Sequence, residues 1–372
     1  MRIAIDAMGG DFAPDAVISG SLMALELLEK GDELILVGPK ETIEPKLNGQ
    51  PDFAATLSIE HAPDVIGMDE PPIDSLRKKP RSSIGILAKL GKLGRTDAVI
   101  SAGNTGACVA AFQMRMRNIP GVNRPGIAVV FPTFGGPVTI CDVGANIACK
   151  PINLYQYAVM SAIYSKQLFG IQKPRVGLMS IGEEDAKGNE NVKKARELIK
   201  KDPKVNFIGN IEGRDVFKGV CDVAICDGFV GNVILKLTEG LVDGLFKAIK
   251  QEVMSQKINF LLAPVFRNVM RSIYKKYDYN EYGGALLLGV NGTALICHGA
   301  SEARTIKNAI MISKKYYNEK INEKIAEYLA GSTIREETGG AEAGDSTLRQ
   351  GTAQPDSPQR DDALRVTDGQ VD

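Results

Sequence analysis

Short β-branched runs that end in a polar, glycine-containing turn and lead into a helix recur along this chain. The clearest example follows the run Val220 to Ile225. Its turn holds four residues of this kind, Asp227, Gly228, Gly231 and Asn232, and the apolar-periodic segment Val233 to Leu245 comes next. Open α/β sheets bind ligands outside the carboxyl ends of such strands. Because Gly and Asp are also ordinary turn residues, this segment alone leaves a ligand site and a plain βα turn equally open.

Three more turns have the same composition. They are Ser101 to Ala107, Asp142 to Asn146 and Ile181 to Asn189. Each follows a short apolar run, and further runs with strand-like patterns stand earlier in the chain, at Arg2 to Asp6, Glu33 to Val37 and Thr56 to Glu60. Strands that alternate with helices favour a sheet of parallel strands covered on both faces. We therefore expect the four polar turns to converge on one edge of such a sheet.

The turn after Ser101 reads Ala-Gly-Asn-Thr-Gly-Ala and precedes a helix of small residues. Glycines allow close backbone approach to a ligand, and the helix start presents free N–H groups to an anion. Gly103, Asn104, Thr105 and Gly106 are the candidate residues here. The turn matches neither a Walker loop nor a dinucleotide-binding G-x-G-x-x-G, so the sequence does not support nucleotide binding.

Composition narrows the class of protein further. The 372 residues contain 44% hydrophobic and 24% charged residues, which is typical of a soluble globular protein. We expect a cytoplasmic protein, because the chain enters a strand pattern at its first residues and has no run as long as a membrane span. Its six cysteines lie in apolar runs without a C-x-x-C pair, so we expect buried thiols and no metal site.

Charge is spread unevenly along the chain. The segment from Gly331 onward carries 9 acidic and 4 basic residues and has no aromatic side chain, so we expect residues 331–372 to form a disordered acidic tail. The body, residues 1–330, is then mildly basic. That is too weak for a nucleic-acid reader, but it favours an acidic partner.

Two basic features stand out within the body. Arg77, Lys78, Lys79 and Arg81 precede a helix capped by Ser82 or Ser83, and on sequence alone a solvated loop is slightly preferred to an anion site. Farther on, residues 258–277 repeat apolar side chains at spacings of three and four and carry cations on another face. This periodicity favours packing within the domain or against a dimer partner over an amphipathic helix on a membrane.

The motifs taken together resemble one family, the bacterial phosphate acyltransferases of the PlsX type. The resemblance rests on IDAMGGDFAPD, KKPRSSI, SAGNTGA, DVGAN with CKP, IGEEDAKGN, FIGNIEGRDVFKGVCDVAICDGFVGN, and YGGALLLGVNG followed by HG. These stand in the same order over about 330 residues. The chain departs from the family pattern at Ala148, where an acidic residue is usual, and at Asn123 and Leu286, where Asp and Pro are usual.

The resemblance implies a three-layer α/β/α fold with a largely parallel sheet, like that of the isocitrate and isopropylmalate dehydrogenases, plus a protruding helical hairpin at about residues 250–280. It implies transfer of a fatty acyl group from acyl-(acyl carrier protein) to inorganic phosphate for phospholipid synthesis, without a cofactor. It also implies a homodimer, a downstream acyl-phosphate:glycerol-3-phosphate acyltransferase, and peripheral membrane association through the hairpin. The residues expected at the membrane are Leu261, Leu262, Val265, Phe266 and Val269.

The expected site residues follow partly from the resemblance, which places Asp227 and Asn232, and partly from the polar turns and the charge of phosphate. Asp227 and Asn232 are expected at the reacting centre, with Lys187 as the cation that compensates the phosphate charge. Phosphate and substrate are expected to meet the turn residues, which are Gly103, Asn104, Thr105, Gly106, Asn146, Asn189, Gly228, Gly231 and His298. His61, the other histidine, is expected to be structural.

Three other functions are weighed against this one. The nearest is a phosphotransacetylase-like enzyme that uses acyl-coenzyme A. A dehydrogenase on the related fold is disfavoured, because there is no dinucleotide turn and no obvious cluster of metal-binding carboxylates. A membrane-bound interaction module without catalysis would leave the four polar glycine turns unexplained.

Overall fold

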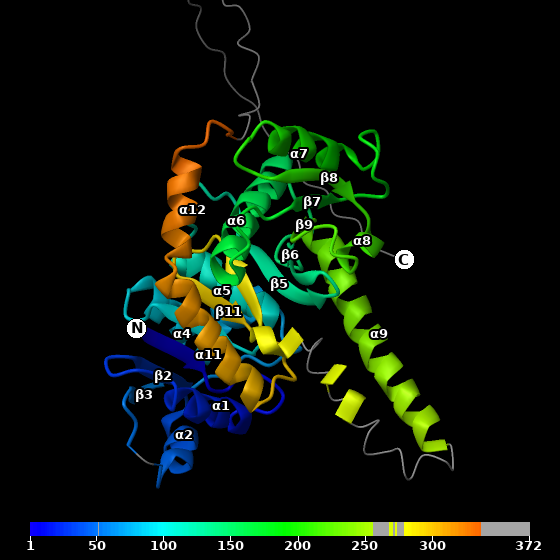
Figure 1. Ribbon diagram of the computed structural model, residues 1–372. Coiled ribbons are helices and arrows are strands. Elements are labelled where there is room, and N and C mark those ends of the chain that lie inside the picture. The colour runs from blue at the N-terminus through cyan, green and yellow to red at the C-terminus, as the bar shows by residue number, and fades with distance from the viewer. Residues whose placement is uncertain (51, 256–267, 271, 274–278, 336–372) are drawn as a thin grey trace, which may run out of the picture. The chain divides into compact units, whose positions relative to one another are not determined.

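The computed structural model describes residues 1–50, 52–255, 268–270, 272–273 and 279–335. Within these residues the strands form an 11-stranded sheet in the order β3-β2-β1-β4-β11-β10-β5-β6-β9-β7-β8 (Figure 1). The strands are β1 Arg2–Asp6, β2 Glu33–Gly38, β3 Thr56–His61, β4 Ala98–Ser101, β5 Gly126–Thr133, β6 Gly136–Cys141, β7 Val176–Met179, β8 Phe207–Ile211, β9 Val223–Ile225, β10 Ala285–Leu288 and β11 Thr293–Ile296.

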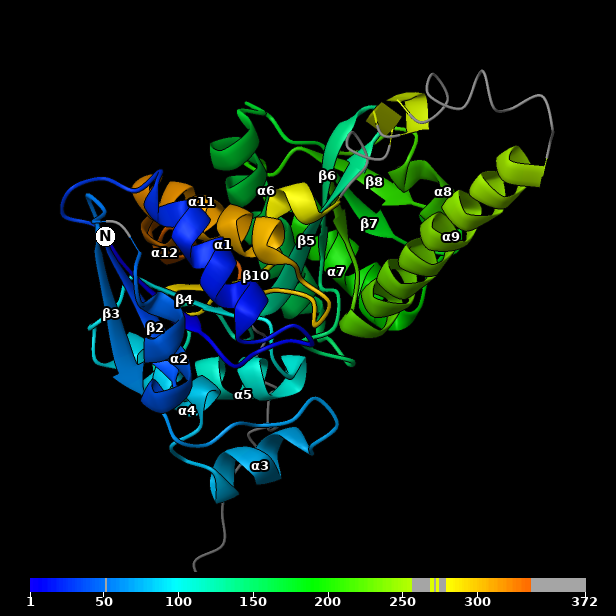
Figure 2. The ribbon, with the colours of Figure 1, turned by 90° about the horizontal axis from the view of Figure 1, so that it is seen from below.

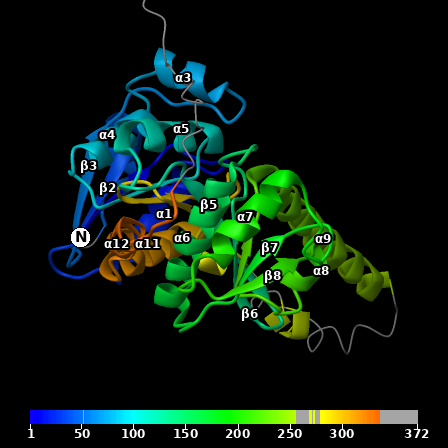
Figure 3. The ribbon, with the colours of Figure 1, turned by 90° about the horizontal axis from the view of Figure 1, so that it is seen from above.

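Helices cover both faces of this sheet (Figures 2 and 3). They are α1 Asp15–Leu25, α2 Lys40–Leu47, α3 Pro72–Lys78, α4 Ser83–Lys92, α5 Thr105–Met116, α6 Pro151–Phe169, α7 Glu190–Lys200, α8 Gly213–Val216, α9 Gly228–Ser255, η1 Tyr279–Tyr282, α11 Ala303–Asn318 and α12 Ile321–Ala330. The expected three-layer α/β/α fold is therefore confirmed.

Alternation along the strands builds a separate core on each face of the sheet. In β1, Ile3 and Ile5 point into the core under α1, α6 and α11, whereas Ala4 points into the core under α4 and α5. Successive strand residues face opposite sides, so a strand buried on both faces must be apolar throughout. This explains why the apolar runs of the sequence are continuous.

The sheet is largely parallel, but its two halves run in opposite directions. The β10 strand is antiparallel to both β11 and β5, and β5 is antiparallel to β6. The strands β1, β4 and β11 therefore run against β6, β9 and β7. The expectation that all four polar turns leave one edge of a parallel sheet is wrong for this reason.

The strand register nevertheless brings the polar turns of both halves together. One row of paired residues crosses the sheet through Ile5, Ile100, Leu295, Leu286, Ala128, Cys141 and Ile225. In β1, β4, β11, β6 and β9 this row meets the last or next-to-last residue of the strand. The carboxyl ends of the strands in the two oppositely directed halves therefore lie at the same level of the sheet, on either side of β10 and β5.

Two sequence expectations about helices need correction or restriction. The helix expected to begin at Ser301 and run to about Leu329 is two helices, α11 and α12, which separate where Lys320 adopts the left-handed conformation with φ 51°. The helix after Asn232 is longer than expected, since α9 extends to Ser255 and projects away from the sheet (Figure 1).

The expected membrane-facing residues lie mostly outside the described residues. Leu261, Leu262, Val265 and Phe266 are not described, and Val269 is half exposed. No described helix has both the length and the apolar character needed to cross a membrane. Of the hairpin expected at about residues 250–280, the described residues are the end of α9, residues 268–270 and 272–273, and the start of η1.

Candidate active site

A cavity of about 130 Å³ opens beside the row where the two halves of the sheet end. Its polar lining includes Thr105 at the start of α5, Glu239, Asn232 and Lys236 on α9, and His298 after β11. Most of the remaining wall is apolar, with Ile127, Val129, Val143, Leu235, Ala285 and Ile296. A concave, mostly apolar site with a few convergent polar groups is the usual form of a small-molecule site.

Close packing fixes the start of α9 at this cavity. The Gly228 N–H donates to the Asn146 carbonyl oxygen at 2.8 Å, and Asp227 Oδ1 accepts from the Val230 N–H at 2.8 Å. A Cβ on Gly231 would lie 1.9 Å from the Asp142 carbonyl oxygen, so only glycine allows this approach. Asp227 therefore caps α9, and the helix places Asn232 on the cavity wall.

The turn under α9 is organised by the buried carboxylate of Asp142. It accepts backbone N–H groups from Ile127, Gly144, Ala145 and Asn146 at 2.7 to 3.0 Å. Burial raises the pKa of Asp142, and these N–H donors partly offset that effect. The carboxylate shapes the 142–146 turn from inside rather than facing the cavity.

The side-chain amides of Asn146 and Asn104 form hydrogen bonds within the protein. The Asn146 Nδ2 donates to the Pro125 carbonyl at 2.6 Å and to the Tyr157 hydroxyl at 2.8 Å. The Asn104 Nδ2 donates to the carbonyls of Gly67, Met68 and Glu70, while its Oδ1 accepts from the Ala107 N–H at 3.0 Å. Both side chains are buried and position their turns, so they do not present free donors to a ligand.

A second buried carboxylate, Asp6, supports the turn at the start of α5. It accepts from the Ser101 hydroxyl at 2.7 Å, and the Ser101 oxygen accepts from the Gly103 N–H at 3.0 Å. Burial raises the pKa of Asp6, with hydrogen bonds from Ser83 and Ser101 opposing the shift. A Cβ on Gly9 would lie 2.6 Å from the Gly103 nitrogen, so the turns after β1 and β4 are packed backbone to backbone.

Thr105 and Gly106 are the first two residues of α5. Both are exposed, and as the first residues of the helix their N–H groups have no acceptor within it. The partial positive charge of the helix start lies at the same place. Of the four residues expected to hold phosphate in this turn, these two face solvent, whereas Gly103 and Asn104 are buried.

Lys187 and Asn189 lie on the loop between β7 and α7. Lys187 is exposed and is not part of the cavity wall. Asn189 caps α7 by accepting from the Val192 N–H at 2.9 Å. Leu178 of β7 pairs with Ile225 of β9, so this loop and the start of α9 leave neighbouring strands.

Lys236 is a cavity residue that sequence reasoning missed. Its Nζ lies 3.3 Å from His298 Nε2 and 2.8 Å from Glu239 Oε2. Residues 232, 236 and 239 all line the cavity, because spacings of four and seven return to the same helix face. That spacing, counted forward from Asn232, is the signal that would have identified Lys236 and Glu239.

Two further expectations concern cysteines and metals. All six cysteines are free and buried, as expected, and burial raises the thiol pKa of Cys149 to about 11 and that of Cys297 to about 12. Among the described residues, no group of three or more His, Cys, Asp or Glu side chains is placed to hold a metal ion. His61 accepts from the Lys40 N–H through Nδ1 at the end of β3, far along the sheet from the cavity.

Comparisons with known proteins decide the family. The model of the fatty acid synthesis protein family matches residues 1–324. The chain belongs to the phosphate acyltransferase family. It is 46% identical over 332 residues to the phosphate acyltransferase of Heliobacterium modesticaldum, which covers 89% of this chain and 98% of the relative. It is 43% identical over 333 residues to that of Nitratidesulfovibrio vulgaris strain DP4, covering 89% and 95%.

Solved structures show that the family's fold is shared more widely. A phosphotransacetylase from Streptococcus pyogenes matches this phosphate acyltransferase family member with a TM-score of 0.59 at 16% identity, covering 86% of this chain and 94% of that one. The EutD phosphotransacetylase from Staphylococcus aureus gives 0.54 at 14% identity, covering 85% and 94%. At these identities the likeness concerns the fold alone.

Proposed function

We propose that this protein transfers a fatty acyl group from acyl-(acyl carrier protein) to inorganic phosphate, which yields acyl phosphate and free carrier protein for phosphatidic acid synthesis. The observation that carries the proposal is the cavity, whose lining combines donors for an anion with a mostly apolar wall. The wall suits an acyl chain, and the donors suit phosphate or the oxygen of a thioester carbonyl. Membership of the phosphate acyltransferase family supports the same reaction.

The reaction needs no covalent enzyme intermediate, because phosphate is itself a nucleophile toward a thioester. A bond forms between a phosphate oxygen and the carbonyl carbon, the carbon–sulfur bond breaks, and the leaving thiolate takes the proton that hydrogen phosphate gives up. The protein's task is to hold the two substrates in line and to stabilise the oxyanion. The buried cysteines, whose thiols stay protonated, fit a mechanism without a cysteine nucleophile.

Residue roles follow from the proposed reaction and the geometry. Asn232 on the cavity wall donates to the oxyanion or to phosphate. Asp227, one turn earlier, orients the nucleophile or Lys187, whose loop leaves the strand next to the one that leads to Asp227. Thr105 and the backbone of Gly106 contribute donors from the start of α5, while Asn104, Asn146, Gly228 and Gly231 support these groups from behind.

The proposed partners are the carrier protein, a second copy of this chain, and a membrane surface that leads to the downstream acyltransferase. An exposed apolar stripe along α9, formed by Val233, Leu237, Leu241 and Leu245, supports the homodimer. Large contiguous apolar patches on a soluble protein mark interaction surfaces. The proposed location is the cytoplasm, with peripheral attachment to the membrane.

Phosphate-dependent release of carrier-protein thiol from a long-chain acyl-(acyl carrier protein) tests the proposal, with acyl-coenzyme A in a parallel reaction. We expect faster release from the carrier-protein thioester and formation of acyl phosphate. Release from acyl-coenzyme A alone would instead support the phosphotransacetylase-like alternative. No release from either thioester would overturn the proposed reaction and leave the fold assignment unaffected.

A further inference from the structure

Two basic side chains reach the same end of the cavity from opposite halves of the sheet. Lys236 comes from the third turn of α9, and His298 comes from the turn after β11. Their nitrogens Nζ and Nε2 are 3.3 Å apart, and both side chains line the cavity. This pair spans the junction that the strand register creates.

Each ring nitrogen of His298 has one polar neighbour. The Ala300 N–H donates to Nδ1 at 3.2 Å, and a backbone amide is always a donor. The Lys236 ammonium, which is also always a donor, lies 3.3 Å from Nε2. An anion that accepts from this ammonium is therefore also within reach of Nε2, which is a donor when the ring carries a hydrogen there.

Glu239 pairs with Lys236 on the same face of α9. Its Oε2 accepts from the Lys236 Nζ at 2.8 Å, one helical turn along α9. The Lys236 side chain is 53% exposed, so this pair does not neutralise it as a buried pair would. The ammonium keeps further N–H donors for a second acceptor, since Lys carries three.

The third contribution comes from the start of α5. Thr105 lines the same cavity, and its hydroxyl and the N–H groups of the first helical residues add neutral donors. A cation, an imidazole and a hydroxyl in the lining of one cavity match an anion with several oxygens. The neighbouring wall of Ile127, Val129 and Leu235 does not.

We propose that Lys236 and His298, assisted by Thr105, bind the inorganic phosphate that attacks the thioester. This inference rests on the proposed function and adds a phosphate-binding cation to it. The phosphate dianion then lies between Lys236 on α9 and the loop that carries Lys187. The two lysines offset the negative charges of Asp227 and Glu239. The carbonyl carbon meets the phosphate oxygen at the boundary with the apolar wall.

Titration of the full-length protein with inorganic phosphate, followed by calorimetry or by phosphorus NMR, tests the inference without turnover. We expect Lys236→Met and His298→Ala each to weaken phosphate binding at least tenfold, and Lys236→Arg to retain most of it. Lys250→Met is the matched control, because Lys250 is an exposed lysine farther along α9 and away from the cavity. Unchanged phosphate affinity in Lys236→Met, or no phosphate binding by the wild-type protein, would overturn the inference.

Steady-state kinetics separates this inference from the proposed function. Lys236→Met should raise the KM for phosphate at least tenfold and leave the KM for acyl-(acyl carrier protein) within twofold. A lower kcat with an unchanged phosphate KM would assign Lys236 to the oxyanion and overturn phosphate binding. If the wild-type protein binds phosphate through Lys236 but releases no thiol, the proposed reaction fails while the phosphate site stands.

Discussion

The role proposed for Lys187, an exposed loop residue, rests on charge alone. A phosphate dianion beside Asp227 is unfavourable unless a cation lies nearby, and the loop of Lys187 leaves the strand next to the one that leads to Asp227. We expect Lys187→Ala to lower kcat by about two orders of magnitude. Lys173→Ala, at the opposite ends of the strands, is the control and should retain full turnover. Turnover near the wild-type value in Lys187→Ala would remove this lysine from the mechanism.

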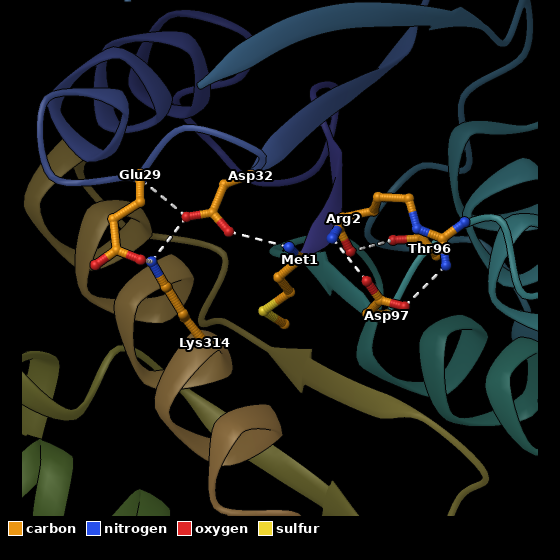
Figure 4. A network of polar contacts seen from close by, with 7 residues as sticks. All are labelled: Met1, Arg2, Glu29, Asp32, Thr96, Asp97 and Lys314. Carbon is orange, nitrogen blue, oxygen red and sulfur yellow. Dashed lines mark hydrogen bonds and ion pairs between the residues drawn. The ribbon is translucent and has the colours of Figure 1, made fainter. Parts of the chain in front are cut away.

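Asp32 is a buried carboxylate away from the cavity, and it makes stability depend on pH. Its oxygens accept from the Met1 ammonium at 3.0 Å, from Lys314 Nζ at 2.7 Å and from the Glu29 N–H at 2.9 Å (Figure 4). Burial opposes ionisation and is the largest single effect. The hydrogen bonds together outweigh it and lower the pKa of Asp32 to about 2.

Because the pKa of Asp32 is lower in the folded protein than in the unfolded chain, ionised Asp32 stabilises the fold. This stabilisation is complete only at pH values where Asp32 is ionised in the unfolded chain as well. The stabilisation is therefore full above about pH 4 and is lost as the pH falls toward 2. We expect Asp32→Asn to lower the free energy of unfolding by roughly 2 kcal/mol at pH 7, and the difference from wild type to vanish near pH 2. Chemical denaturation at several pH values measures this. Glu190→Gln, which removes an exposed ion pair with Lys194, should change stability little at any pH.

At the scale of elements, the start of α9 depends on one glycine. A methyl group at Gly231 would collide with the carbonyl oxygen of Asp142, so α9 would have to move away from the 142–146 turn. We expect Gly231→Ala to cost about 1–3 kcal/mol of stability and to lower kcat about a hundredfold, because Asn232 and Lys236 shift with the helix. Thermal unfolding and thiol release measure the two effects.

Gly213→Ala serves as the control for this substitution. Gly213 also begins a helix, α8, but the nearest atom to an added Cβ is 4.0 Å away. Its stability and turnover should stay close to those of the wild-type protein. Equal losses in the two variants would mean that Gly231 matters through its backbone freedom rather than through the contact with Asp142.

Local sequence patterns predicted most elements but not how they are joined. β-Branched runs identify strands, whereas the direction of each strand depends on its partners, so the reversal at β10 and β5 was not visible. No glycine or proline marks the break between α11 and α12, where Lys320 takes the left-handed conformation. Turn residues therefore could not predict this break. The length of α9 was also underestimated, since the expected apolar segment ended at Leu245 and the helix runs to Ser255.

The candidate site was predicted at the level of turns rather than of side chains. An asparagine in a glycine turn looks the same in sequence whether its amide faces a ligand or the backbone. The Asn104 amide donates to carbonyl groups within residues 67–70, more than 30 positions earlier. Only the folded chain brings these groups together. Lys236 was missed for the opposite reason, because a lysine on an amphipathic helix resembles an ordinary solvated one.

At the scale of the whole molecule, α9 exposes more apolar surface than an isolated chain favours. Leu237, Leu241 and Leu245 are each more than half exposed along one face of the helix. We expect two copies of the chain to cover these faces, so that Leu237→Glu with Leu241→Glu converts a dimer into a monomer. Light scattering after size-exclusion chromatography measures the mass. A wild-type protein that is monomeric at micromolar concentration would contradict the homodimer.

We expect the proposed carrier protein, if acidic, to dock on a basic surface beside the cavity, and α3 carries such a surface. The hydrogen bonds of Asn104 tie residues 67–70 to the start of α5, which places α3 next to Thr105 and Gly106. Arg77 and Lys78 occupy the last turn of α3 and are exposed, whereas Lys79 is already paired with Glu70. Complementary charge of this kind speeds association and is weakened by salt.

Charge reversal at α3 tests this docking surface. We expect Arg77→Glu with Lys78→Glu to raise the KM for acyl-(acyl carrier protein) at least tenfold and to leave the phosphate KM unchanged. In the wild-type protein, rising salt should weaken carrier-protein binding more than phosphate binding, and the double variant should lose most of that salt dependence. The matched control is Lys89→Glu with Lys92→Glu, which reverses the same charge in the last turn of α4. If both pairs raise the KM equally, net charge rather than α3 directs the carrier protein. If neither pair does, the carrier protein approaches the cavity from another side, and the cations of the α9 half become the next surface to examine.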